Sequence, residues 1–332
     1  MSFATRLKAL SSHPAVFLAV ALVAQVLMVN WGAHDPKHPM GDVIYAYQPW
    51  VNYMLESGKA FGLNLTWVYP YPALAPILLA HLIAPTDYLL GWIELAIAVN
   101  MAALSLLVIR NRNAVKLGWY WLAATLALGP VALSRLDGIS IAIALFGVAA
   151  LLKRNAGVTA FWFTAATWLK VWPAALVATM ASRVADRRRI FMVGGVTSLA
   201  FVALGYLLGG NGSMFSFITQ QDARGLQIES VVAMPWVWRA VNHQNAVIYF
   251  DTHILAFQVR ASGAAQAAAA MSWMMLAAVA LTLAMTLVAS WRQVRAEELM
   301  AQASLVLMLD LIVFNKVGSP QYLGWLIVPV LL

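Results

Sequence analysis

The residues of this sequence that suit chemistry are few, and the first is Asp42, in the stretch "GDVIYAYQPW" at residues 41–50. It follows an apolar run over residues 14–30 that reads as a membrane span. A carboxylate at this position has two interpretations. It can accept a proton from a hydroxyl as a general base, or it can cap the next helix, because Asp is a favoured N-cap residue. The sequence alone leaves both open.

Further polar side chains lie in segments that we predict on the same side of the membrane as Asp42. Arginines and lysines from several helices can bind an anionic leaving group such as phosphate. The neighbours Arg135 and Asp137 are also typical of a structural ion pair, and Lys170 is typical of a side chain that reaches to the membrane interface. The candidates for binding a substrate are Arg135, Asp137, Lys170, Arg224, Gln227, Glu229, Lys316, Gln321 and Tyr322.

The composition indicates a membrane protein. The 332 residues have a mean hydropathy of +0.77, and only 10% of them are charged, whereas soluble domains carry about 25%. The apolar residues form long blocks, which favours spanning helices over the alternating strands of a barrel. No polar stretch is long enough for a soluble domain, so we expect one membrane domain over residues 1–332.

Several classes of site and partner are not expected. The chain contains no cysteine, which excludes disulfides and thiol catalysis. Its histidines lack zinc-ligand spacing, so we predict no metal and no cofactor. The net charge of +8 comes mostly from short loops between apolar runs, which orient spans rather than bind nucleic acid.

The basic loops at 6–8, 110–116, 153–154, 183–189 and 292–295 should be cytoplasmic under the positive-inside rule. Two interpretations allow all of these loops to lie on the cytoplasmic side of the membrane. The run 71–84 is too short for an upright span and is read as an interfacial or re-entrant helix. The run 157–182 is split at Pro173, which disfavours helical geometry at the residue before it.

We therefore predict an all-α polytopic protein with about ten transmembrane helices and an interfacial helical first extracytoplasmic loop. The last apolar run, from residue 321, is too short to cross a bilayer comfortably, so we expect the C-terminal end to be incomplete. The expected spans are 14–30, 88–109, 117–133, 139–152, 157–182 in two parts, 190–209, 267–291, 299–314 and a last one from 321.

Three ordered segments resemble glycosyltransferase family 87. They are residues 134–177, which contain "LKVWP", residues 224–230, "RGLQIES", and residues 316–326, "KVGSPQYLGWL". The resemblance covers nearly the whole chain. It implies the type C membrane glycosyltransferase fold, a plasma-membrane location, an extracytoplasmic active site and a polyprenyl-phosphate-mannose donor. Many members have Gly-Gln-x-Asn where this chain has Arg135-Leu136-Asp137-Gly138, so the donor and acceptor do not simply carry over.

The resemblance also implies roles for the candidate residues. Asp42 would be the catalytic base that activates a hydroxyl of a glycolipid or cell-envelope glycan acceptor. The departing polyprenyl phosphate would be stabilised by Lys170, Arg224 and Lys316. The sugar hydroxyls would be bound by Gln227, Glu229 and Gln321. The scheme inverts a β-linked donor into an α-linked product and requires no metal.

Two alternatives remain at this point. The same scaffold could transfer another polyprenyl-phosphate sugar, such as arabinofuranose or glucose. A lipid-linked-sugar transporter or flippase would instead use Glu94 and Asp310, acids that lie within predicted spans. A transporter coupled through those two acids should tolerate Asp42→Asn, whereas a transferase should not.

Overall fold

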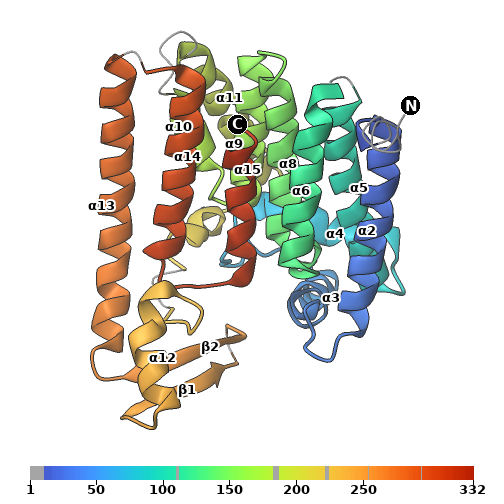
Figure 1. The fold of residues 1–332 in the computed structure, drawn as a ribbon. Coiled ribbons are helices and arrows are strands. Elements are labelled where there is room, and N and C mark those ends of the chain that lie inside the picture. The colour runs from blue at the N-terminus through green and yellow to red at the C-terminus, as the bar shows by residue number, and fades with distance from the viewer. Residues whose placement is uncertain (1–10, 110–111, 182–186, 221–223, 253, 293) are drawn as a thin grey trace, which may run out of the picture.

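The computed structural model describes residues 11–109, 112–181, 187–220, 224–252, 254–292 and 294–332. The chain forms a bundle of roughly parallel and antiparallel helices with a small lobe at one end (Figure 1). The basic residues Arg6, Lys8, Arg110 and Arg183, which the orientation argument uses, lie outside the described ranges.

Four helices of the described ranges are long and apolar enough to cross a membrane: α2 (Pro14–His34), α5 (Tyr88–Val108), α11 (Arg187–Leu207) and α13 (Ala264–Trp291). Three of them have 21 residues, which at the α-helical rise is roughly 30 Å, the thickness of the hydrocarbon core. The start of α5 is fixed by Asp87, whose side chain accepts a hydrogen bond from the Leu90 amide. These helices indicate a multi-pass membrane protein.

The other expected spans are shorter helices. By length and composition, the described ranges therefore contain four candidate spans and not the predicted ten or so. Gly129, at φ +66°, ends α6 (Val115–Leu128) before the short α7 (Val131–Ser134). The run 139–152 lies in α8 (Leu136–Leu151), of 16 residues. The remaining ones are α14 (Ala296–Val313), which carries two acids in its first turn, and the C-terminal η7 (Pro320–Leu326) with α15 (Ile327–Val330).

The break predicted at Pro173 is confirmed. Helix α9 (Ala156–Leu169) ends before it, and α10 (Ala174–Ala181) begins directly after it. Lys170 at the break has an extended backbone, which turns its side chain away from the helix axis. Proline thus creates the irregular backbone that presents this lysine.

The segment after α2 is helical, as expected, but irregular. A π-helical turn, η1 (Val43–Tyr47), follows Asp42 and continues into α3 (Gln48–Ser57), which ends at Gly58 with φ +66°. The apolar run 71–84 forms the 3₁₀ turn η2 (Tyr71–Ala73) and the short helix α4 (Leu74–Ile83). A buried cluster that includes Val43, Tyr47 and Trp92 packs η1 and α3 against α4 and α5.

The segment between α11 and α13 departs from an all-α fold. It contains η5 (Gly212–Ile218), η6 (Val231–Ala233), α12 (Met234–Val241) and an antiparallel hairpin of β1 (Ala246–Asp251) and β2 (Ala256–Ala261). The β-branched and aromatic residues of "AVIYFD" are typical of a strand, a signal that the helical prediction passed over. The hairpin, α12 and α3 lie at the same end of the bundle (Figure 1).

We expect Gly91→Ala to destabilise the protein by about 1–3 kcal/mol, as overpacking does. A Cβ at Gly91 of α5 would collide with the carbonyl oxygen of Ala80 in α4, so the two helices would have to separate. The control is Gly195→Ala in α11, where a Cβ meets nothing within 4 Å. Thermal unfolding of the two variants in lipid nanodiscs measures the difference; equal midpoints would contradict this account of α4–α5 packing.

Candidate functional site

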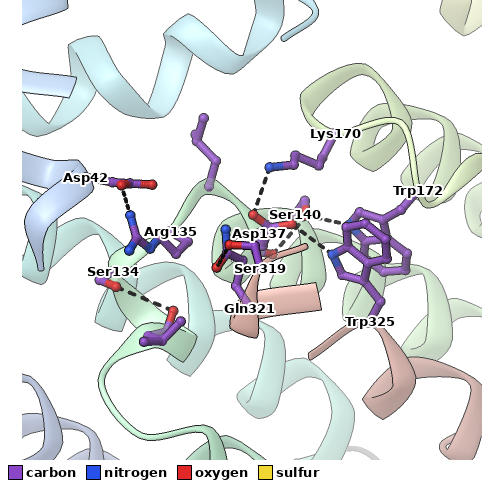
Figure 2. Close-up of polar contacts among 12 residues, drawn as sticks. Asp42, Ser134, Arg135, Asp137, Ser140, Lys170, Trp172, Ser319, Gln321 and Trp325 are labelled. Carbon is purple, nitrogen blue, oxygen red and sulfur yellow. Dashed lines mark hydrogen bonds and ion pairs between the residues drawn. The ribbon is translucent and has the colours of Figure 1, made fainter. Parts of the chain in front are cut away.

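Asp42 forms an ion pair with Arg135 and does not cap a helix. Its backbone is already helical, and its side chain makes no capping hydrogen bond. A carboxylate oxygen instead meets Nη1 of Arg135 (Figure 2). The side chain of Asp42 remains 37% exposed, so the N-cap interpretation is wrong and the acid stays accessible to another molecule. The π-helical turn directly after it is a feature often found at functional sites.

Arg135 lies in the extended link between α7 and α8, where its side chain is 17% exposed. Burial lowers the pKa of its guanidinium to about 10, while the negative charges of Asp137 and Glu229 act against that change. Arg135 is therefore a cation at neutral pH. Burial also raises the pKa of Glu229, and the charge of Arg135 opposes that shift. These mutual charge effects indicate that Glu229, in the 224–230 segment, lies close to the link before α8.

Asp137 forms an ion pair with Lys170 rather than with Arg135. Lys170 Nζ lies 2.9 Å from Oδ2 of Asp137, and Trp325 Nε1 donates to Oδ1 at 2.8 Å. The Asp137 side chain is only 2% exposed. These contacts contradict two predictions: Asp137 is not the ion-pair partner of Arg135, and Lys170 does not reach out to the membrane interface. Because its oxygens are held by two donors, Asp137 has a structural role.

Lys170 also contacts two tyrosine rings. Its Nζ lies 4.5 Å from the ring centroid of Tyr69 and 6.0 Å from that of Tyr322, distances suited to cation–π attraction. Tyr322 lies near both Lys170 and Arg224, and its ring stacks on that of Trp325 with the centroids 4.2 Å apart.

The two C-terminal motif segments pack directly on each other. The Gln227 amide donates to the carbonyl oxygen of Lys316 at 3.1 Å. A Cβ at Gly318 would collide with the backbone of Glu229 and Ser230, so only glycine permits this approach. The approach places the backbone of residues 224–230 beside that of residues 316–322.

The predicted sugar-binding residues are placed differently from one another. Gln227 is 3% exposed and bridges to Gln258 of β2, which places it under the hairpin. Gln321 Oε1 accepts a hydrogen bond from Ser319 Oγ at 2.6 Å, and both lie between the two ion pairs in Figure 2. Lys316 is 8% exposed. The structure thus brings Gln321 to the ion pairs but not the side chain of Gln227.

Three polar side-chain atoms around the ion pairs are buried and have no hydrogen-bond partner in the described part of the chain: Arg135 Nε, Arg224 Nε and Ser230 Oγ. Buried polar groups are normally paired, so each such atom calls for a partner from water or a ligand. All three can donate to an anionic oxygen. Ser230 was missed by the sequence analysis, where its only signal was its place at the end of "RGLQIES".

A small cavity lies on the other side of Asp137, among α5, α6, α8 and η7. Its lining includes Asn100, Thr125, Asp137, Gly138 and Gln321. The free space at its centre, about 10 Å³, suits one water molecule and no sugar. This cavity is therefore too small to be a substrate pocket.

Comparisons of the chain with protein-family models, with curated proteins and with solved structures find no match.

The two acids of the transporter alternative do not come together. Asp310 in α14 accepts a hydrogen bond from Thr282 of α13 at 2.7 Å. Glu94 is exposed on α5, which lies toward the other side of the bundle (Figure 1). The structure shows no chain of polar contacts between these acids among its described residues. Those residues also contain no group of three His, Asp or Glu side chains that could hold a metal ion.

We expect Asp137→Asn to lower stability by about 3–5 kcal/mol, because it leaves the buried Lys170 charge without its partner. Replacing both partners, as Asp137→Asn with Lys170→Met, should recover part of the loss. The control is Glu298→Gln, which breaks the exposed Arg295–Glu298 pair and should change stability by less than about 1 kcal/mol. Thermal unfolding in nanodiscs measures all three; an Asp137→Asn variant as stable as the control would contradict the structural role.

Proposed function

We propose that this protein is a membrane glycosyltransferase that transfers a mannosyl residue from a polyprenyl-phosphate donor to a glycolipid or cell-envelope glycan. The proposal is carried by one observation: an accessible carboxylate, Asp42, adjoins a cluster of cations contributed by separate segments. Asp42 lies against Arg135, and Lys170 and Arg224 are further cations close by, both acting on Tyr322. Such cations suit the negative charge of a phosphodiester, the linkage between such a donor sugar and its lipid.

The reaction follows from these charges. Asp42 accepts the proton of an acceptor hydroxyl while that oxygen forms a bond to the anomeric carbon. The bond between the anomeric carbon and the phosphate oxygen breaks, and its electron pair leaves with the polyprenyl phosphate. Arg135, Arg224 and Lys170 stabilise the charge that develops on that phosphate, since preorganised cations are most effective away from bulk water. One acid is sufficient, because a phosphate leaves without being protonated.

The proposal includes the type C glycosyltransferase fold and an extracytoplasmic site in the plasma membrane. In the proposed fold, about ten crossings are approached when shorter apolar helices are added to the four long ones. These shorter helices are α6, α8, α9 with α10, and α14. It is supported by the distribution of charge: α8 and α13 lead into Lys153, Arg154 and Arg292 at the end of the bundle opposite α3 and the hairpin (Figure 1). Basic residues at one end favour that end as cytoplasmic.

Mannose is proposed from the family resemblance, and arabinofuranose or glucose would suit the same cations and base. The transporter alternative is less well supported, because within the described ranges Glu94 and Asp310 share no polar contacts with each other or with Asp42. The cations around Arg135 instead support the binding of a lipid phosphate, as the transferase proposal requires.

We expect Asp42→Asn to reduce transfer at least about 100-fold, the usual loss when a general base is removed. Membranes with matched amounts of wild type or variant receive radiolabelled polyprenyl-phosphate-mannose and an endogenous lipid extract. The control is Glu56→Gln, an exposed acid of α3, which should transfer label as the wild type does. Equal label with Asp42→Asn would remove Asp42 as the base. No label with any of the three would argue against mannose as the donor sugar.

Sidedness can be tested separately, because the chain has no natural cysteine. Lys59→Cys, just after α3, and Arg154→Cys, just after α8, each add one exposed thiol at opposite ends of the bundle. In whole cells a membrane-impermeant maleimide should label the first and not the second. The reverse pattern would place the Asp42 end in the cytoplasm and contradict the proposed topology.

A further inference from the structure

The contact between Arg135 and Asp42 raises a question about the order of events in the proposed reaction. An opposite charge beside a carboxylate stabilises its ionised form and weakens it as a proton acceptor. Asp42 is in this state here, with one oxygen against the Arg135 guanidinium. While this ion pair is intact, Asp42 is therefore a weak general base.

Several features of Arg135 allow it to exchange Asp42 for another anion. Its pair with Asp42 is only partly buried, with the two side chains 17% and 37% exposed. Its Nε is buried and has no hydrogen-bond partner among the described residues. A guanidinium presents its donors as a planar fork that matches phosphate oxygens bidentately. A phosphate at the unpaired Nε would therefore compete with Asp42 for the same cation.

The other charges near Arg135 do not offer an alternative partner. Asp137 of α8 is held by Lys170 at the end of α9 and by Trp325 of η7. Glu229 of the 224–230 segment acts on Arg135 through its charge and makes no ion pair with it in the described structure. An arriving anion would thus compete with Asp42 for direct contact with Arg135, while Asp137 and Glu229 act on it through their charges alone.

We propose that Arg135 is a positioning residue that restrains Asp42 until the donor's phosphate binds, so that donor binding releases the base for the acceptor. This inference rests on the proposed function. It predicts an ordered reaction in which the lipid-linked donor binds before the acceptor hydroxyl is deprotonated. It also predicts that a donor-free enzyme does not activate water or acceptor at Asp42.

The test measures the titration of Asp42 directly. The full chain in nanodiscs carries aspartate labelled with ¹³C at the side-chain carboxyl, and Asp42→Asn assigns the signal. The probe is a short-chain polyprenyl phosphate, whose binding is followed by its ³¹P signal in the same sample. We expect the probe to raise the titration midpoint of Asp42 by about 1–3 pH units, the effect of removing an adjacent cation.

The variant Arg135→Gln separates partner exchange from the field of the bound phosphate. In this variant the titration midpoint of Asp42 should already be high without the probe, and the probe should not raise it further. Arg135→Lys, a second variant that keeps the charge, should respond to the probe with a smaller shift. The control Arg260→Gln alters a hairpin cation that lies over Tyr249 and should respond as the wild type does.

Two results would overturn the inference while leaving the proposed function intact. One is probe binding to the wild type with no change in the Asp42 midpoint. The other is an equal shift in wild type and Arg135→Gln, which would show a field effect without exchange. Absence of probe binding, together with absence of mannosyl transfer by the wild type, would instead reject the proposed function and this inference with it.

Discussion

The arrangement of this site depends on the buried ion pair between Asp137 and Lys170. Removing two charges from water is costly, so such a pair persists only when its remaining hydrogen-bonding capacity is used. Here Trp325 donates to the second carboxylate oxygen, and Trp172 donates to Ser140, whose hydroxyl bonds the Asp137 carbonyl. The contacts join the start of α8, the break after α9 and the turn η7. Segments far apart in sequence are thereby fixed around one charge.

This constraint gives the two aspartates different roles. Asp137 is enclosed and fully engaged, and it neutralises Lys170 without being able to meet a substrate. Asp42 is partly exposed and, among the residues that the structure describes, forms an ion pair with Arg135 alone, so it can change partners. Arg135 forms an ion pair with Asp42, and the negative charges of Asp137 and Glu229 also act on it. Its guanidinium therefore stays protonated in spite of burial. Both residues are aspartates, so accessibility rather than chemical type separates the structural acid from the proposed base.

The sequence predicted the features that follow from local chemistry. The proline break after Lys170, the helix after Asp42 and the long apolar spans all depend on residues close together in the chain. The partners of Arg135 and Asp137 could not be predicted, because they depend on how α3, α8 and α9 pack. The same is true of Ser230, whose role depends on Gly318 allowing two segments to touch. The hairpin was missed because its strands are short and lie between long apolar helices.

In the proposed function, the cations around Asp42 bind the phosphate of a lipid-linked sugar. An electron cryomicroscopy structure of the full chain in nanodiscs with a short-chain polyprenyl phosphate tests it most directly. We expect phosphate density within hydrogen-bonding distance of Arg135 Nε and Arg224 Nε, with Asp42 released from Arg135. Phosphate density elsewhere, or an intact Asp42–Arg135 pair beside a bound phosphate, would contradict it.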